Sequence, residues 1–219
     1  MTTEAPTLET TERTTFNRSP QRGSYERAAI NSILDAGVIC QLGYVMAGEP
    51  RVLPTVYWRT GEAVYWHGSR ASGALGAMAG RQVCFTVTVL DGLVLARSAF
   101  HHSANYRSVM AFGRAEVVED EVSQLAAYRE MFDRLYPGRW PHIRKPSRAE
   151  LVATIVLRLE LIEASAKVRA GPPIDSRADL RQPAWAGVIP LSLKPGPPAP
   201  AEDLKAGAAP VTVPAWIGS

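Results

Sequence analysis

The sequence predicts a mainly-β domain, built as a small antiparallel barrel with flanking helices. Six or seven short apolar runs alternate between two faces, as strands with one buried face do. Turn signals such as Asp91-Gly92 separate these runs too closely for the crossover helices that parallel strands need. Three helical patterns stand between the runs, so a barrel fits this order better than a doubly wound parallel sheet.

The N-terminal part is expected to hold an arm followed by one helix. Residues 1–22 are rich in Thr, Glu and Arg and lack a hydrophobic period, which indicates a flexible or loosely docked arm. From Ser24 onward apolar residues recur at helical spacing, and Gly37 is a natural stop.

Seven apolar runs are interpreted as strands. They are Val38–Ala47, Arg51–Arg59, Ala63–His67, Arg81–Leu90, Leu93–Ala99, Tyr106–Val118 and Leu151–Ile162. Pro54 interrupts the second run, which predicts a sheet edge or a place where the ladder opens. Asp91-Gly92 is the strongest hairpin signal and is expected to turn the fourth run into the fifth. The last run is the clearest, because its alternate residues form one unbroken apolar face.

Two further helices and a proline-rich end complete the chain. Ser72–Ala79 is short and rich in Ala and Leu, and Asp120–Tyr136 is amphipathic. Ten of the 17 prolines lie from Pro172 onward, so this region forms neither a packed helix nor a central strand. We therefore expect four parts. They are the arm 1–22, the barrel domain 23–170, an extended segment 171–193 packing on the domain, and a Pro/Ala-rich tail 194–219.

Composition narrows the class of partner and the compartment. The net charge is +3 without a run of five like charges, which hints at anionic ligands and argues against nucleic acid. Cys40 and Cys84 each lie in an apolar run and are expected to be buried free thiols in a reducing compartment. No apolar run approaches the ~20 residues of a membrane helix, and the polar N-terminus lacks a signal-peptide core. We expect a cytoplasmic protein that binds neither membrane nor nucleic acid.

The turn His67–Gly73 is the first candidate site. It follows a strand and opens a helix, where backbone N–H groups attract anions. Ser69 and Ser72 add hydroxyl donors, Arg70 adds charge, and Gly68 permits close approach. Both a phosphate cradle and an ordinary capped loop remain open, since the pattern is neither a Walker loop nor a dinucleotide fingerprint.

A second polar cluster, Phe100–Ser108, lies between two apolar strands. His101 and His102 are adjacent, and neighbouring side chains on extended backbone point opposite ways, so they are poor joint ligands for one metal. No spacing typical of zinc is present, and no metal site is expected. Arg107 suits either a phosphate or a carboxylate partner.

A third cluster combines Lys167 and Arg169, on one face of a strand end, with Trp185. It is either a basic wall for an anionic ligand or a solvated strand edge. The chain has no Ser/His/Asp order, nucleophile elbow or paired-carboxylate pattern that would identify a hydrolase.

Taken in order, several of these blocks resemble a known family. They are Ile33-Leu34-Asp35, Arg51–Arg59, Val64–Ser69 with Ser72, Phe100–Val109 and Ala166–Pro173. Their order and spacing over about residues 24–190 resemble the pyridoxamine-phosphate-oxidase-like family of FMN-binding split β-barrels. The resemblance is greatest to the branch of nitroimidazole-resistance-type flavin proteins.

The resemblance implies a six-stranded antiparallel split barrel that dimerises through its sheet, with FMN at the dimer interface. The implied FMN-binding residues are Thr55 and Tyr57 beside the flavin, His67, Gly68, Ser69, Arg70 and Ser72 at the phosphate, and Tyr106, Arg107 and Ser108 from the partner subunit. Lys167, Arg169 and Trp185 are candidates on the substrate side. Where pyridoxamine phosphate oxidases have a Ser-Arg-Lys run, this chain has Arg70-Ala71-Ser72 and lacks the lysine, so oxidation of pyridoxamine phosphate is not expected.

The implied function is that of an FMN flavoprotein, a reductase or oxidase of a small molecule, in which the flavin carries the chemistry. One alternative is a non-catalytic protein that sequesters a flavin or a deazaflavin. The other is haem binding, with His67, His101 or His102 as an axial ligand.

Overall fold

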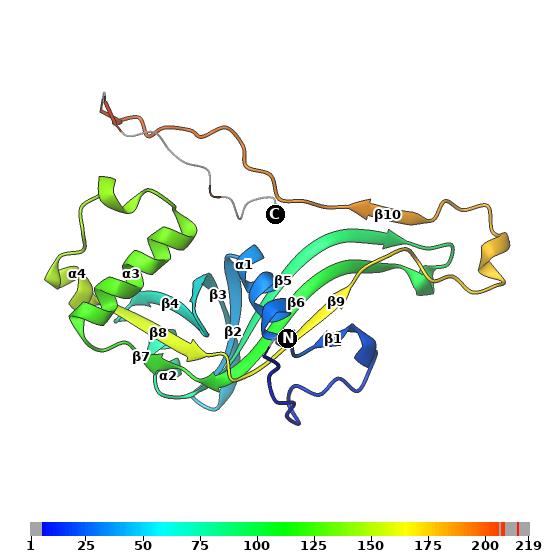
Figure 1. Cartoon of the computed structure of the whole chain (residues 1–219), viewed down its shortest axis with the longest axis horizontal. Coiled ribbons are helices and arrows are strands. Elements are labelled where there is room, and N and C mark those ends of the chain that lie inside the picture. The colour runs from blue at the N-terminus through cyan, green and yellow to red at the C-terminus, as the bar shows by residue number, and fades with distance from the viewer. Residues whose placement is uncertain (1–5, 206, 209–213, 215–219) are drawn as a thin grey trace, which may run out of the picture.

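The computed structural model describes residues 6–205, 207, 208 and 214 (Figure 1). Within them, ten strands form one sheet in the order β1-β9-β6-β5-β2-β3-β4-β8-β7, and β10 pairs with β5. The strands are β1 (Gly23–Ser24), β2 (Ile39–Met46), β3 (Glu49–Thr60), β4 (Ala63–Ser69), β5 (Gln82–Leu95), β6 (Ser103–Arg114), β7 (Glu116–Val117), β8 (Thr154–Glu160), β9 (Glu163–Arg169) and β10 (Gly187–Pro190). The helices are α1 (Arg27–Ala36), α2 (Gly73–Met78), α3 (Glu121–Leu135) and α4 (Arg148–Ala153).

The sheet is antiparallel and curls into a half-barrel, which confirms the predicted fold class. The additional strands are mostly short edge segments, since β1 and β7 have two residues each and β10 has four. Among the described residues, no helix has the length and apolar character needed to cross a membrane.

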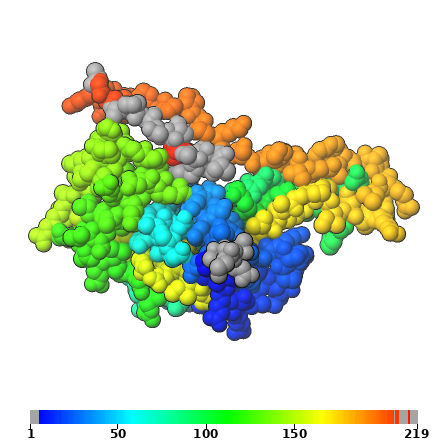
Figure 2. Space-filling view, in the orientation of Figure 1, coloured from blue at the N-terminus to red at the C-terminus, as the bar shows by residue number. Residues whose placement is uncertain are grey.

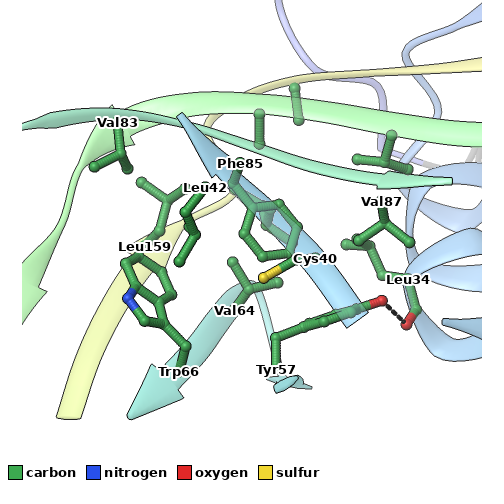
Figure 3. Packing of buried hydrophobic residues seen from close by; sticks show 14 of the residues in the cluster. Leu34, Cys40, Leu42, Tyr57, Val64, Trp66, Val83, Phe85, Val87 and Leu159 are labelled. Carbon is green, nitrogen blue, oxygen red and sulfur yellow. Dashed lines mark hydrogen bonds between the residues drawn. The ribbon is translucent and has the colours of Figure 1, made fainter. Parts of the chain in front are cut away.

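The barrel interior is formed by one face of the central strands. The register aligns Leu42 of β2 with Phe85 of β5 and Phe85 with Ala111 of β6, and all three are fully buried. The Tyr57 hydroxyl donates to the Leu34 carbonyl at 2.6 Å, which ties β3 to α1 (Figure 3). Helix α1 thus closes one end of the barrel.

Helix α3 covers part of the opposite face of the sheet. Trp58 of β3 and Val156 of β8 are buried there against Ala127, Met131 and Leu135 of the helix. This second cluster positions Trp58 of β3 and Tyr128 of α3 beside His67.

The prediction of a hairpin turn at Asp91-Gly92 is wrong. β5 continues from Gln82 to Leu95, with only a bulge between Leu90 and Gly92, and the chain reverses after Leu95. Pairing with β6 along almost the whole strand outweighs the local turn preference of Asp91-Gly92. Gly92 instead allows β10 to approach β5 closely, because a Cβ at this position would lie 2.8 Å from the Ile189 carbonyl oxygen.

The run Leu151–Ile162 also differs from the prediction, because its first residues belong to α4. Ser147 and Glu150 form a capping box that starts this helix and outweighs the alternating pattern. The prediction for Pro54 is confirmed. β4 pairs with β3 only from Tyr57 to Thr60, so the ladder is open beside the proline.

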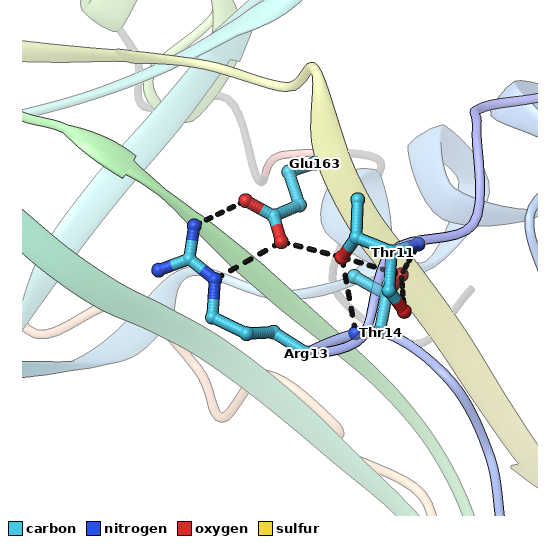
Figure 4. A network of polar contacts seen from close by, with 4 residues as sticks. All are labelled: Thr11, Arg13, Thr14 and Glu163. Atoms are coloured by element: carbon cyan, nitrogen blue, oxygen red, sulfur yellow. Dashed lines mark hydrogen bonds and ion pairs between the residues drawn. The ribbon is translucent and has the colours of Figure 1, made fainter.

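Part of the predicted arm contacts the sheet, through Thr11 and Arg13 beside Glu163 (Figure 4). Glu163 of β9 accepts from the Thr11 hydroxyl at 2.5 Å and from the Arg13 Nε at 3.0 Å. The Arg13 guanidinium also lies 4.8 Å from the centre of the Phe112 ring, and Leu8 is buried. Residues 1–5 lie outside the described part of the chain.

The C-terminal segment runs along the long β5–β6 hairpin (Figure 2). The side chain of Asp175 is only 1% exposed and binds Arg97, with 2.9 Å to its backbone N and 2.8 Å to its Nη1. β10 then pairs with β5 from Gly187 to Pro190. Of the tail 194–219, residues 206, 209–213 and 215–219 are outside the described residues.

Both cysteines are free thiols, as predicted, but only Cys40 is fully buried. Burial raises the pKa of Cys40 to about 12, so its thiol is unreactive. Cys84 is half-buried, because its strand position faces the outer side of the sheet.

Candidate functional site

The turn His67–Gly73 joins the end of β4 to the start of α2. Ser72 caps α2 by accepting from Leu75 N at 3.5 Å, and Ser69 Oγ accepts from Ala71 N at 3.2 Å. The capped-loop interpretation therefore describes the local hydrogen bonds. It leaves open whether the same hydroxyls also bind an anion.

Arg70 braces this turn against the end of α4 and the start of β8. Its backbone N donates to the Ala153 carbonyl at 2.8 Å. Its Nε donates to the Val152 carbonyl at 3.0 Å and its Nη2 to the Thr154 carbonyl at 3.3 Å. The guanidinium is exposed, so it must exchange these bonds if it is to contact a phosphate in the turn.

His67 lies in an aromatic box between β4 and α3. Its ring centre is 5.8 Å from that of Trp58 and 5.4 Å from that of Tyr128. Among the described residues its Nδ1 is buried without a hydrogen-bond partner. Burial lowers the pKa of His67, so the imidazole is neutral near pH 7 and offers a nitrogen lone pair.

This lowered pKa makes stability depend on pH. Below the ordinary histidine pKa of about 6.5, the unfolded chain binds a proton that native His67 resists. We expect the free energy of unfolding to fall as the pH drops from about 6.5 towards the native pKa, and to level off below it. Urea titrations between about pH 7.5 and 5 measure this slope.

The control for this pH effect is an equivalent change at an exposed histidine. His67→Gln is expected to flatten the slope, and His142→Gln to leave it unchanged, because His142 is exposed to solvent. Equal slopes in wild type and His67→Gln would contradict the assignment.

The structure brings the second and third clusters together on adjacent strands. Tyr106 of β6 pairs with Arg169 of β9, and Ser108 pairs with Lys167. The Ser108 hydroxyl donates to the Lys167 carbonyl at 3.3 Å, and the Lys167 ammonium lies 5.2 Å from the centre of the Phe16 ring.

Arg169 is a structural residue and not an open basic wall. It is 6% exposed and donates to the Asn105 side-chain oxygen. It also donates to the Gly171 and Pro172 carbonyls, each at 3.4 Å. It fixes the chain where the C-terminal segment leaves β9.

Of the two partners expected for Arg107, a phosphate or a carboxylate, the structure shows the carboxylate. Its Nη2 lies 2.9 Å from Asp91 Oδ1 and its Nε 3.0 Å from Asp91 Oδ2. These hydrogen bonds raise the pKa of the guanidinium. The sequence predicts Asp91 as a turn residue and not as the partner of Arg107. The one sequence signal for this ion pair is an acidic residue within an alternating run, next to another run that carries an arginine.

Tyr57 belongs to the core rather than to a cofactor face. Its side chain is 1% exposed and its ring packs edge-on against Phe85, 5.1 Å between centres. The structure therefore corrects the expectation that this side chain lies beside a flavin, because the ring and its hydroxyl are fully engaged inside the barrel. Thr55 is half-buried, and its carbonyl accepts from the Cys40 thiol at 3.5 Å.

The turn His67–Gly73 is distant from the β6–β9 group along the sheet. Strands β5, β2 and β3 lie between β6 and β4 in the order of the sheet. Trp185 lies apart from both, 65% exposed in the C-terminal segment. Within one chain, the predicted site residues therefore form two separate sets.

The histidines of the second cluster lie at the turn of the β5–β6 hairpin. His102 Nδ1 is 2.9 Å from the Ser98 carbonyl oxygen, and His101 Nε2 is 3.9 Å from Asp179. Over the described ranges, no three His, Cys, Asp or Glu side chains are placed to hold a metal ion.

Sequence reasoning missed a groove beyond the C-terminal end of α2. It has a volume of about 860 Å³ and includes Met46, Arg81 and Arg114 in its lining. A smaller hollow of about 280 Å³ lies beside Arg107 and is lined in part by residues 191–193. A third, of about 460 Å³, lies between α3 and Arg158. Arg81 and Arg114 belong to no recognisable sequence motif, and only the folded chain brings them to the same groove.

The half-barrel with its helix-capped turn defines a split-barrel protein of the pyridoxamine-phosphate-oxidase-like type. The family model described as pyridoxamine 5'-phosphate oxidase matches residues 26–168. The chain therefore belongs to this family, and the resemblance seen in the sequence is confirmed.

Solved structures extend the similarity over nearly the whole chain. The flavocytochrome Anf3 from Azotobacter vinelandii is 41% identical, with a TM-score of 0.86, covering 94% of this chain and 95% of that one. An FAD and haem binding protein from Mycobacterium smegmatis is 35% identical, with a TM-score of 0.81 over 89% and 95% of the two chains.

A third structure shares the fold alone. It is a putative 5-nitroimidazole antibiotic resistance protein from Bacteroides thetaiotaomicron, 19% identical, with a TM-score of 0.56 over 67% of this chain and 86% of that one. No curated protein matches the sequence.

Proposed function

We propose that this chain is a cytoplasmic, homodimeric flavoprotein that exchanges electrons with a small molecule. The observation that carries the proposal is the 41% identity over 94% of the chain with a flavocytochrome. The 35% identical relative, an FAD and haem binding protein, supports the same class. A bound flavin would accept or donate the hydride, and the protein would supply binding and orientation.

In this proposal the turn His67–Gly73 holds the phosphate of an FMN unit, either FMN itself or the FMN half of FAD. Ser69 and Ser72 present hydroxyls, and Arg70 supplies the positive charge. The chain has Ser72 in place of the lysine that the resemblance to pyridoxamine phosphate oxidases implies, so these hydroxyls and the turn backbone must provide most of the hydrogen bonds.

The homodimer is proposed through the outer sheet face, defined here by Ile39, Val52, Leu90 and Met110. The strand register places them on the side opposite the core, and they are 44%, 67%, 48% and 43% exposed. An apolar face of this kind on a sheet is typical of an interaction surface. A second copy would bring its Tyr106 and Ser108 towards the turn that one chain alone keeps distant from them.

Light scattering tests the dimer. Wild type is expected at twice the 23.8 kDa chain mass, and Val52→Glu at the monomer mass, because a buried unpaired carboxylate is costly. Val122→Glu is the matched control, since Val122 is 80% exposed on α3. A monomeric wild type would exclude the interface.

The visible spectrum of the purified protein tests the flavin. Flavin absorbance, or saturable binding of added FMN or FAD, is expected. Steady-state reduction of oxygen or a nitroaromatic by reduced nicotinamide distinguishes an oxidoreductase from a protein that only sequesters the cofactor. A colourless protein that binds neither flavin would overturn the proposal.

Haem is a second candidate ligand, favoured by a specific observation. His67 is neutral and buried, and among the described residues its Nδ1 has no hydrogen-bond partner, so its lone pair is not used within the chain. One similar protein is a flavocytochrome and another binds haem with FAD. A Soret band that is lost in His67→Ala but retained in His102→Ala would support His67 as the ligand.

Arg70→Ala is expected to weaken flavin binding by about 1.5–3 kcal/mol, because a charge-assisted hydrogen bond to phosphate is lost. A fluorescence titration with FMN measures the change. Urea unfolding of the apoprotein measures separately how much stability is lost with the Arg70 hydrogen bonds to α4 and β8. Arg177→Ala, an exposed arginine in the C-terminal segment, is the control. Unchanged affinity would place the phosphate elsewhere.

A further inference from the structure

The hollow beside Arg107 opens where two strands of the sheet part. Strand β2 pairs with β5 only from Gln41 to Gly43, and β5 then continues beyond β2 as one side of the long hairpin (Figure 1). The hollow is lined by Ile39 at the start of β2 and by residues 88–91 of β5, beyond the paired part. Its volume of about 280 Å³ is just below the roughly 300–1,000 Å³ of most ligand pockets, so it suits a molecule with one ring.

The C-terminal segment supplies a further wall of this hollow. Directly after β10, the backbone N of Leu191 donates to the Asp91 carbonyl at 3.0 Å. This bond holds residues 191–193 along the hollow, where Leu191 and Leu193 add apolar surface. The walls come from parts of the chain that are far apart in sequence, so the hollow forms only in the folded protein.

Part of the Arg107 guanidinium is not used within the described chain. Its Nε and Nη2 donate to Asp91, whereas no described residue accepts a hydrogen bond from its Nη1. Both side chains of the ion pair line the hollow and are partly exposed. Arg107 Nη1 can therefore donate to a ligand oxygen, and Asp91 keeps lone pairs that can accept from a ligand N–H.

The charges around the hollow favour a neutral ligand over an anion. Asp91 neutralises Arg107, so a carboxylate bound at Nη1 would lie beside the Asp91 carboxylate and be repelled. The C-terminal end of α1, at Ala36 and Gly37, also lines the hollow and carries a partial negative charge. A neutral carbonyl accepts from Nη1 without either repulsion, and a primary amide can in addition donate to Asp91.

The hollow lies next to the residues that are proposed to approach the flavin of a second copy. Tyr106 pairs with Leu90 and Ser108 pairs with Thr88, and both partners line the hollow. Ile39 and Leu90, which also line it, belong to the outer sheet face through which the dimer is proposed. A second copy that brings its Tyr106 and Ser108 towards the turn would therefore bring this hollow with them.

We infer that the hollow beside Arg107 is the substrate pocket and that it takes a neutral carbonyl compound with a small apolar body. The inference rests on the proposed flavoprotein function and deepens it by naming the substrate class. Arg107 Nη1 donates to the ligand carbonyl, and the apolar body lies against Ile39 and Leu191.

An NMR titration of the full chain with benzamide and with benzoate tests the inference. The two probes share one ring and differ in charge. Benzamide is expected to shift the amide signals of residues 88–91 and 191–193. Benzoate is expected to bind at least about tenfold more weakly, because Asp91 repels it. In the flavin-loaded protein, benzamide is expected to slow competitively the reoxidation of dithionite-reduced flavin by duroquinone, a neutral one-ring carbonyl compound.

Asp91→Asn is expected to reverse the preference for a neutral probe. Arg107 loses its counter-ion in this variant, so benzoate is expected to bind at least about tenfold more tightly than to wild type, and benzamide within about threefold. A gain in binding cannot come from a loss of folding. Glu116→Gln is the matched control, because it removes a carboxylate from Arg158 beside another hollow and is expected to change neither affinity.

The outcomes separate this inference from the proposed function. If flavin binds but benzamide shifts no signal at the hollow, or binds there without slowing duroquinone, only this inference falls. Equal affinities of wild type for the two probes, or no gain for benzoate in Asp91→Asn, also overturn it alone. If wild type binds no flavin, the proposed function falls and the substrate role of the hollow falls with it.

Discussion

Replacing Trp66 by alanine is expected to lower the free energy of unfolding by about 3–5 kcal/mol. Trp66 is fully buried in β4, and its ring centre lies 6.4 Å from that of Phe85 across the barrel. Truncation removes the largest kind of apolar side chain and leaves a cavity that close-packed neighbours cannot fill. A loss of this size is a large share of the 5–15 kcal/mol, roughly, that stabilise a domain.

Urea unfolding measures the change, with the slope of the transition checked for constancy. Trp185→Ala is the matched control. Its indole is 65% exposed, so we expect a change of about 0.5 kcal/mol or less. If Trp66→Ala fails to fold, Trp66→Phe should show an intermediate loss. A Trp66→Ala protein about as stable as the control would contradict the packing argument.

Gly92→Ala is expected to detach β10 from the sheet. A Cβ at this position would lie 2.8 Å from the Ile189 carbonyl oxygen and 3.1 Å from a methyl of Val188. The backbone atom cannot turn aside as a side chain does, so the two strands must separate. Overpacking costs about 1–3 kcal/mol, which is comparable with what a four-residue edge strand gains.

Hydrogen exchange reports the detachment, because the backbone amides within residues 187–189 lose their pairing with β5. We expect faster exchange there and earlier proteolytic cleavage after Gly171, with the barrel core unchanged. Gly43→Ala is the control, since its Cβ would meet Cys84 at an ordinary 3.4 Å. Equal protection of β10 in both variants would refute the steric argument.

The strands and helices with strong periodicity were predictable, and the two exceptions have different causes. The start of α4 is set by the Ser147–Glu150 capping box, a local signal that the alternation of Leu151–Ala153 obscured. At Asp91-Gly92 the local turn signal is outweighed by pairing with β6. Long-range pairing can outweigh local preference, and a single sequence does not display it.

The local structure of the candidate turn was predictable, but the arrangement of the candidate residues was not. Ser69 and Ser72 lie in a turn between strand and helix, as their spacing indicated. Tyr57 entered the core instead, because a tyrosine ring can be buried once its hydroxyl finds a carbonyl such as that of Leu34. Arg81 and Arg114 line the same groove only because β6 returns to the end of α2.

The docking of the N-terminal arm on Glu163 has a consequence for biosynthesis. Arg13 is translated 150 residues before its partner, an interval of roughly 8–30 s at about 5–20 residues per second. Throughout that interval Arg13 lacks its Glu163 partner, and the sheet lacks β9, the strand that pairs with β6. The domain therefore closes only near the end of its synthesis, and its high proportion of distant contacts predicts slow folding and a need for chaperone protection.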